Sequence, residues 1–319
     1  MWIVLLVLAA AALLVLFSAW LCFYITFYVP KKEKTPKAEF DLPRGKIYEP
    51  YAEDMIRWIK EVRALPREEL QIVSDDGLVL KGNYYEYAPG APIELMFHGY
   101  RGAAERDLCG GVQRCFRLGH SALLVDQRAA SKSEGKVITF GVQEHRDCLK
   151  WAELAQERFG EDAKVILCGI SMGATTVLMA AGEELPKCVV GVLADCGFSS
   201  AKEIICKVIR QIHLPQKLVY PLIRLGAKLY GGFNLEDSDA TRAMARCRLP
   251  VLFFHGTEDD FVPWQMSQKN FEACAAQKKL VLVPGAGHGL SYLLDPQGYL
   301  AAVREFEPYW GINRKETTK

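Results

Sequence analysis

The sequence predicts an α/β protein, in which a mostly parallel sheet carries helices on both faces and a hydrophobic helix precedes it. Short apolar runs, typical of buried strands, alternate with longer helix-like segments over most of the chain. No charged side chain occurs from Trp2 to Val29. Half of the 319 residues are hydrophobic, which is enough for a sizeable core.

The uncharged N-terminal stretch is longer than the roughly 20 apolar residues that a membrane-spanning helix needs. Trp20, Tyr24 and Tyr28 stand where interfacial aromatic residues occur. A cleaved signal peptide is the alternative, but no basic residue precedes the stretch and no clear A-x-A site follows it. We therefore expect a membrane anchor over residues 1–30, followed by a basic, proline-containing linker over residues 31–50.

The first part of the expected domain combines a helix, a hairpin and a β-α-β sequence. Residues 51–65 carry apolar side chains at helical spacing, which predicts a short amphipathic helix. Two alternating runs in "LQIVSDDGLVLKGNYYEY" flank Asp76-Gly77 and predict a β-hairpin. A buried strand, "IELMFHG", a helix, "AERDLCGGVQRCFRLG", and a further strand, "ALLVDQR", follow.

The second part continues the alternation, with one interruption. Helices are expected over 141–159, in "MGATTVLMAAGEEL", around 264–276 and around 296–309. Strands are expected in "KVILCGIS", "VVGVLADCG", "PVLFFHGTEDD" and "KLVLVPGAGHG". Residues 198–247 are rich in helix formers and too long for one crossover helix, so we expect a helical cap inserted into a domain of residues 51–319.

One serine stands between two glycines where a strand passes into a helix, in "ILCGISMGATT". A sharp strand-to-helix turn would expose the Ser171 hydroxyl above the carboxyl edge of the sheet, where ligands of parallel sheets bind. Gly169 and Gly173 would let neighbouring backbone pass close by. The amino end of the following helix favours developing negative charge at the same point.

A serine needs a positioned base, and the base an orienting acid. His288 follows the strand "LVLV" in a glycine-rich loop, and it comes after the candidate acids, as this chain order requires. Glu258, Asp259 and Asp260 crowd one strand-end loop, and their pattern alone does not separate them. The remaining histidines open other strand-end loops or fall in helix and loop contexts: His98, His255, His120, His145 and His213.

The order of these motifs resembles the α/β-hydrolase family over about residues 68 to 310. "GISMGA" resembles the nucleophile elbow, "HGYRG" the oxyanion segment and "HGTEDDFVP" the family's H-G-x-x-D-x-x-V-P, while "GAGHG" carries the histidine. The resemblance implies an eight-stranded, mostly parallel sheet with a cap. It also implies a triad of Ser171, Asp259 and His288, with the backbone N–H groups of Tyr100 and Met172 as oxyanion donors.

Within that family, "DQRAASKSEGKVITFGVQEHRDCLKW" is similar to a bacterial, membrane-anchored subgroup of serine hydrolases. Members of the subgroup usually read D-Q-R-G-H-G-x-S at its start. Here Ala129, Ala130 and Ser131 replace Gly-His-Gly. Because this loop holds no member of the triad, the departure concerns the loop's conformation and its part in the pocket wall.

These residues predict a serine hydrolase that cleaves carboxylic esters through an acyl-enzyme and needs no metal or organic cofactor. A peptidase, a thioesterase or an acyltransferase could use the same residues. A membrane-tethered binding protein that keeps the fold without activity is the alternative from another class. Such a protein typically lacks a triad member, and here all three are present. The expected partners are a small-molecule or lipid-like ester and, through the N-terminal helix, the membrane.

Charge and cysteine content restrict the remaining possibilities. The net charge is +1 and no basic arm is present, which excludes a nucleic-acid partner. Ten cysteines without a C-x-x-C motif argue against a zinc or redox site and favour a reducing compartment. No Lys or Arg precedes the apolar stretch and several follow it, so the positive-inside rule places the catalytic domain in the cytoplasm. The basic residues that follow the apolar stretch are Lys31, Lys32, Lys34, Lys37, Arg44 and Lys46.

Overall fold

The computed structural model describes residues 1–30 and 39–313, and its centre is one eight-stranded sheet. The strand order is β1-β2-β4-β3-β5-β6-β7-β8, with β2 antiparallel to both of its neighbours and the other pairs parallel. This confirms the predicted sheet and its leading hairpin. The strands are β1 (Glu68–Val73), β2 (Val79–Tyr85), β3 (Ile93–Phe97), β4 (Ser121–Val125), β5 (Val165–Ile170), β6 (Val189–Asp195), β7 (Val251–Gly256) and β8 (Lys278–Val283).

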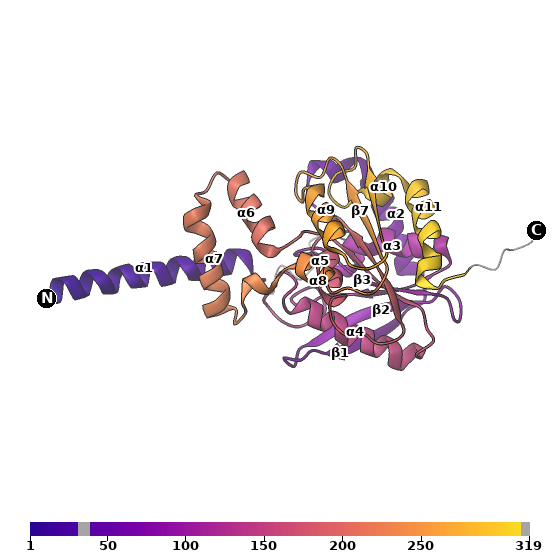
Figure 1. Ribbon diagram of the computed structural model, residues 1–319, viewed down its shortest axis with the longest axis horizontal. Helices are drawn as coiled ribbons and strands as arrows, with labels where there is room; N and C mark the ends of the chain where they lie inside the picture. The colour runs from indigo at the N-terminus through magenta and orange to yellow at the C-terminus, as the bar shows by residue number, and fades with distance from the viewer. Residues whose placement is uncertain (31–38, 314–319) are drawn as a thin grey trace, which may run out of the picture.

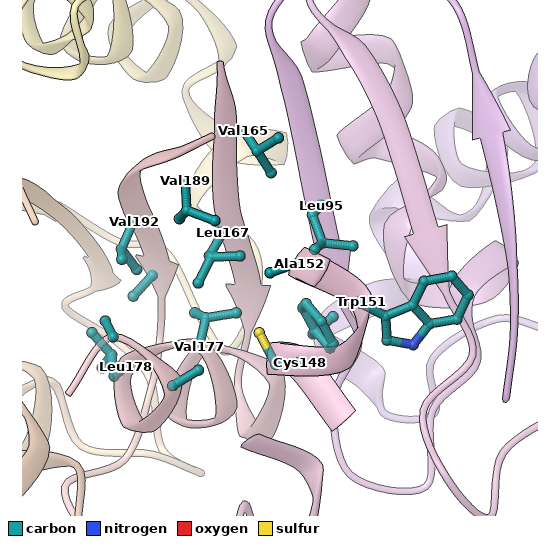
Figure 2. Close-up of a cluster of buried hydrophobic side chains, with 14 of the residues drawn as sticks. Leu95, Cys148, Trp151, Ala152, Val165, Leu167, Val177, Leu178, Val189 and Val192 are labelled. Carbon is teal, nitrogen blue, oxygen red and sulfur yellow. The ribbon is translucent and has the colours of Figure 1, made fainter. Parts of the chain in front are cut away.

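Helices cover both faces of the sheet, which explains why its central strands are largely apolar (Figure 1). On one face, α4 (Glu144–Phe159) and α5 (Met172–Ala180) pack against the strands, and Figure 2 shows Trp151 and Val177 among their contacts there. α8 (Ala240–Met244) and α9 (Trp264–Ala273) extend this layer. The other layer comprises α2 (Ala52–Ala64), α3 (Ala104–Leu118), α10 (Ser291–Leu294) and α11 (Pro296–Phe306).

Two predicted helices have different ends in the structure. α4 begins at Glu144 rather than near residue 141, because the Glu144 carboxylate accepts hydrogen bonds from the backbone N–H groups of Thr139 and Gly141 and so closes a turn before the helix. The terminal helix stops at Phe306, and a 3-10 turn, η4 (Glu307–Trp310), continues it. Pro308 lies in that turn, where its ring and missing N–H disfavour a further α-helical turn.

The N-terminal helix α1 (Trp2–Thr26) extends away from the sheet (Figure 1), and its last turns pack into the protein. Within the described ranges, it is the one helix whose length and composition suffice to cross a membrane. Phe27 is fully buried between the rings of Phe140 and Phe233. Its carbonyl accepts from the Ile138 N–H at 2.9 Å. The chain directly after α1 is thus part of the folded domain.

The segment expected to form a cap divides between two surroundings. α7 (Gln216–Tyr230) packs against α1, and α6 (Ala201–Gln211) packs against α7, both away from the sheet (Figure 1). After the short turn η3 (Leu235–Asp237), α8 returns to the main core, where Ala240, Ala243 and Met244 are buried. The cap helices are therefore residues 201–230 of the segment.

The expected linker is described only from residue 39 onward. Its first lysines, Lys31, Lys32, Lys34 and Lys37, lie outside the described residues. Residues Lys46–Tyr51 form the 3-10 helix η2, and the Tyr48 hydroxyl donates to the His288 carbonyl at 3.0 Å. This end of the linker segment packs against the candidate site.

Candidate active site

Ser171 occupies a strained turn between β5 and α5. Its backbone has φ 57° and ψ −120°, a conformation that side-chain-bearing residues rarely adopt. A Cβ added to Gly169 would lie 2.2 Å from the Gly173 carbonyl oxygen, and one added to Gly173 would lie 2.0 Å from that of Phe97. The two glycines are therefore required by backbone packing around the turn, which accounts for the G-x-S-x-G spacing.

The structure brings the three residues of the expected triad together from three strand ends. His288 Nε2 lies 2.9 Å from Ser171 Oγ, and His288 Nδ1 lies 2.7 Å from Asp259 Oδ2. The second oxygen of Asp259 accepts from the N–H groups of Phe261 and Val262 at 2.9 and 2.7 Å. The carboxylate is thus fixed by its own loop through one oxygen, while the other oxygen orients the imidazole.

Asp259 differs from its neighbours in burial and in hydrogen bonding. Glu258 and Asp260 are exposed, whereas Asp259 is buried. Burial alone would raise the pKa of Asp259, but hydrogen bonds from His255 and His288 outweigh it and hold that pKa below its ordinary value. The carboxylate is therefore ionised at neutral pH, as an acid that stabilises an imidazolium must be.

His255 is the part of this arrangement that the sequence analysis did not assign. It is fully buried, and its Nε2 lies 2.7 Å from the Val262 carbonyl and 3.2 Å from Asp259 Oδ2. Because a carbonyl only accepts, Nε2 carries a proton, and Nδ1 lies 2.7 Å from the Ser267 hydroxyl. His255 thus holds the Asp259 loop. The sequence signal for this role is the position of the histidine at the start of "HGTEDD", four residues before Asp259.

The segment expected to stabilise an oxyanion lies beside the serine. A Cβ at Gly99 would be 3.5 Å from the Ser171 Cβ, and Tyr100 follows directly. Met172 is the first residue of α5. His98 is buried, with Nε2 accepting from the Gln127 N–H at 3.0 Å and Nδ1 lying 2.8 Å from the Gly99 carbonyl. His98 therefore fixes the oxyanion segment.

Two cavities meet at the serine. The larger, of about 720 Å³, runs between η2, α2, α3 and α10 and carries charged groups, among them Arg106 and Asp107. The smaller, of about 290 Å³, lies between α1, α6 and α7. Ser171, Tyr100 and Phe261 line both. A bound molecule can therefore extend from the hydroxyl in two directions that differ in polarity.

Asp195 is a second buried carboxyl at this edge, and sequence reasoning did not select it. It ends β6, lines the larger cavity, and accepts from the Ser291 hydroxyl at 3.0 Å. Burial raises its pKa above the ordinary range. Its carbonyl accepts from the Ser171 N–H at 2.9 Å. The residue thus supports the serine turn through its backbone, and its place at a strand end was the signal.

The chemistry of the site argues against a bound metal. Cys196, Asp259 and His288 present potential ligand atoms within 4.8 Å of one another. Burial raises the pKa of the Cys196 thiol well above its ordinary value, so the sulfur is protonated in the site as it stands. The other two side chains already bind each other. The expected absence of a cofactor stays a prediction.

The loop that contains Ala129, Ala130 and Ser131 has unusual backbone angles. Ala129 and Ser131 adopt φ 61° and φ 40°, in the left-handed region that favours glycine. Neither residue lines the two cavities. Ala129 instead packs in the cluster around Phe27 and Phe140. This part of the loop therefore packs near the end of α1 and not in the walls of the two cavities.

Comparison with known proteins places this geometry among hydrolases. The model of the prolyl oligopeptidase family matches residues 139–302. The protein YqkD of Bacillus subtilis is 28% identical over 190 residues, which are 59% of this chain and 62% of YqkD, so the match spans less than two thirds of that relative. Rv2307c of Mycobacterium tuberculosis is 28% identical over 242 residues, 75% of this chain and 78% of Rv2307c.

Solved structures show the same fold. An esterase of Pyrococcus furiosus, Pf2001, superposes with a TM-score of 0.62 at 18% identity, covering 86% of this chain and 99% of the esterase. At that identity the likeness establishes the fold alone. The sheet, the elbow and these comparisons together make the fold that of an α/β hydrolase, as the sequence predicts.

Proposed function

The chain belongs to the prolyl oligopeptidase family within the α/β-hydrolase superfamily, and from this premise we propose that it is a serine hydrolase that cleaves carboxylic esters at Ser171. The observation that carries the proposal is the hydrogen-bonded series from Asp259 through His288 to the Ser171 hydroxyl. This series ends at the junction of two cavities, where an ester can be held on both sides of its carbonyl.

The distances support a two-step reaction. His288 Nε2 accepts the proton as Ser171 Oγ forms a bond to the ester carbonyl carbon. The tetrahedral intermediate collapses, the bond to the alcohol oxygen breaks, and the proton of His288 goes to that oxygen. Water then attacks the acyl-enzyme with His288 again as base, and the acid and free serine are released. Asp259 stays ionised throughout and stabilises the imidazolium.

The backbone N–H groups of Tyr100 and Met172 are proposed to bind the oxyanion. The close approach of Gly99 to Ser171 and the position of Met172 at the start of α5 support this assignment. Donors of this kind contribute roughly 3–4 kcal/mol each to the transition state in enzymes where they have been removed.

A peptidase is the second candidate, and family membership is the observation that favours it. The apolar cavity beside Ser171 favours an ester with a hydrocarbon acyl group instead. Purified enzyme should be offered 4-methylumbelliferyl butyrate and Ala-Pro-4-nitroanilide in parallel. We expect the ester to be cleaved with the higher kcat/KM. Cleavage of the prolyl amide without cleavage of the ester would reverse the two candidates.

Ser171→Ala tests the nucleophile directly. The variant should lose essentially all hydrolysis of 4-methylumbelliferyl butyrate and all labelling by a fluorophosphonate probe, while keeping its thermal transition. Ser199→Ala is the matched control, because Ser199 is a buried serine that lines neither cavity. Undiminished hydrolysis by purified Ser171→Ala would rule out this mechanism.

α1 is proposed to anchor the enzyme in a membrane, with residues 31–319 on the cytoplasmic side. The proposal rests on the helix's length, its apolar composition and the basic residues that follow it.

A further inference from the structure

We propose that the smaller cavity binds the acyl chain of an ester lipid that resides in the same bilayer as α1, and that α1 itself forms one wall of this acyl site. The inference rests on the proposed function and narrows it to a substrate class. It follows from the lining of the cavity, from the depth at which the cap helices meet α1, and from the charge of those helices.

The lining of the smaller cavity is hydrocarbon-like and includes the N-terminal helix. Cys22, Ile25 and Thr26 come from α1, while α6 and α7 supply branched aliphatic side chains such as Ile205 and Ile223. The cavity reaches Ser171 and passes through no charged residue. A saturated or unsaturated chain can therefore lie against α1 with its carboxyl end at the nucleophile.

α7 meets α1 at a depth that belongs to the bilayer. A Cβ at Gly226 would be 2.4 Å from the Ala19 carbonyl oxygen, so the two helices touch backbone to backbone. The Tyr230 hydroxyl donates to the Leu16 carbonyl at 3.1 Å. At 1.5 Å per residue, α1 exceeds a hydrocarbon core of about 30 Å by only about 7 Å. Leu16 therefore lies within the hydrocarbon wherever an upright α1 is placed.

The cap helices have the composition of helices that lie at a lipid surface. Leu218 and Leu229 of α7 are exposed apolar residues, and so are Ile212 and Leu214 in the connection from α6. α6 and α7 also carry six basic residues and one acidic residue, Glu203, which favours an anionic membrane face. The basic residues are Lys202, Lys207, Arg210, Lys217, Arg224 and Lys228.

The end of α1 is tied to the oxyanion segment as well as to the cap. The Tyr100 hydroxyl donates to the Thr26 carbonyl at 2.7 Å, and Arg101 donates to the carbonyls of Ile25 and Tyr28, each at 2.9 Å. Removal of α1 as a signal sequence would break these contacts and open the cavity. The proposal therefore requires that the mature enzyme keeps α1.

The larger cavity then receives the other part of the ester. Arg106, Asp107, Lys46 and Arg44 line it on the side away from α1. A polar alcohol moiety finds hydrogen-bonding partners in the larger cavity. The acyl chain needs none and suits the apolar lining of the smaller cavity. The two cavities thus match the two ends of an amphipathic ester.

The test compares two neighbouring residues of α1 in the full chain. Enzyme is reconstituted in vesicles of phosphatidylethanolamine and phosphatidylglycerol. In one assay the vesicles contain 4-methylumbelliferyl oleate, and in the other 4-methylumbelliferyl butyrate is added in solution. Cys22→Trp fills the wall of the cavity, whereas Leu21→Trp adds the same ring at an exposed neighbour that does not line it. Only Cys22→Trp should lower kcat/KM for the oleate, by roughly tenfold or more, with the butyrate value within about twofold.

If Cys22→Trp does not accumulate in membranes, a second pair on α7 gives the same comparison. Val219→Trp fills the cavity wall, and Leu218→Trp adds the ring at an exposed neighbour as the control. Fluorophosphonate labelling and butyrate hydrolysis report the serine separately. If the wild type shows neither, the proposed function fails. If it shows both, and the cavity-filling variants lose the two esters together or lose neither, the acyl site is not against α1 and the inference is wrong.

Discussion

At the scale of single residues, the loop "HGTEDDFVP" decides which of three adjacent acids serves His288. Asp259→Asn should lower kcat for 4-methylumbelliferyl butyrate by about 10³–10⁴-fold, because the amide no longer holds the imidazole in the required tautomer. Asp260→Asn should stay within about threefold of wild type, since its side chain is exposed. Steady-state kinetics on both variants checks this. An inactive Asp260 variant beside a normal Asp259 variant would reverse the assignment.

Ser171 and His288 were predictable because each sits in a local motif whose glycines are needed by the turn itself. Asp259 was not separable from Glu258 and Asp260 by local pattern. Its distinction is burial against His255, which depends on the packing of β7 and α9 and so on contacts distant in the sequence. Only the resemblance to a family spacing supplied that information. Asp195 was not predicted, because it stands at the end of an apolar strand and belongs to no recognisable motif.

At the scale of elements, His120 joins β3 to the C-terminal turn η4. Its Nδ1 lies 3.1 Å from Glu94 Oε1 and its Nε2 lies 3.2 Å from Glu307 Oε1. Burial opposes the charged imidazole, but the two carboxylates outweigh it and raise the pKa of His120 above its ordinary value. A raised folded-state pKa stabilises the fold below about pH 6.5, the unfolded value, and this contribution is lost as pH rises through the folded pKa.

Thermal unfolding of the full chain in detergent, followed between pH 6 and pH 9, checks this sign. From pH 6 to pH 9, the Tm of the wild type should fall by more than the Tm of His120→Gln, because glutamine does not titrate. His145→Gln is a suitable control, because His145 is half-buried and contacts the Gly141 carbonyl. Parallel curves for wild type and His120→Gln would show that the imidazole is neutral in the folded protein.

The strands and most helices were predictable because a sheet covered on both faces leaves uninterrupted apolar runs, such as Val165–Ile170. The division within residues 198–247 was not. α7 and α8 both contain buried apolar residues, but α7 buries them against α1 and α8 buries them in the main core. Composition does not specify the partner. η2 and α10 were missed because they are too short to show a periodicity.

At the scale of the whole molecule, the charge around α1 predicts on which side of the membrane the proposed anchor holds the sheet. The positive-inside rule predicts the cytoplasm, since Lys or Arg residues flank α1 only on its C-terminal side. Proteinase K added to intact protoplasts should leave the catalytic domain uncut, and lysis should expose it. Degradation of the domain without lysis would show that it faces outward. A cytoplasmic marker protein serves as the control for leakage.

The hydrogen bond between Tyr230 and Leu16 joins residues 214 positions apart, and this separation dictates an order of assembly. α1 leaves the ribosome first, and the proposed anchoring places it in the bilayer, with lipid around its apolar surface, while most of the chain is still unmade. α7 becomes available only after the six strands β1 to β6 have been synthesised, and His288 is made later still. The nascent protein therefore resides in its proposed substrate throughout synthesis yet has no means of attacking it. On this proposal, lipid covers the α1 wall of the acyl site before α6, α7 and His288 exist, and the cap helices replace part of that lipid as folding finishes.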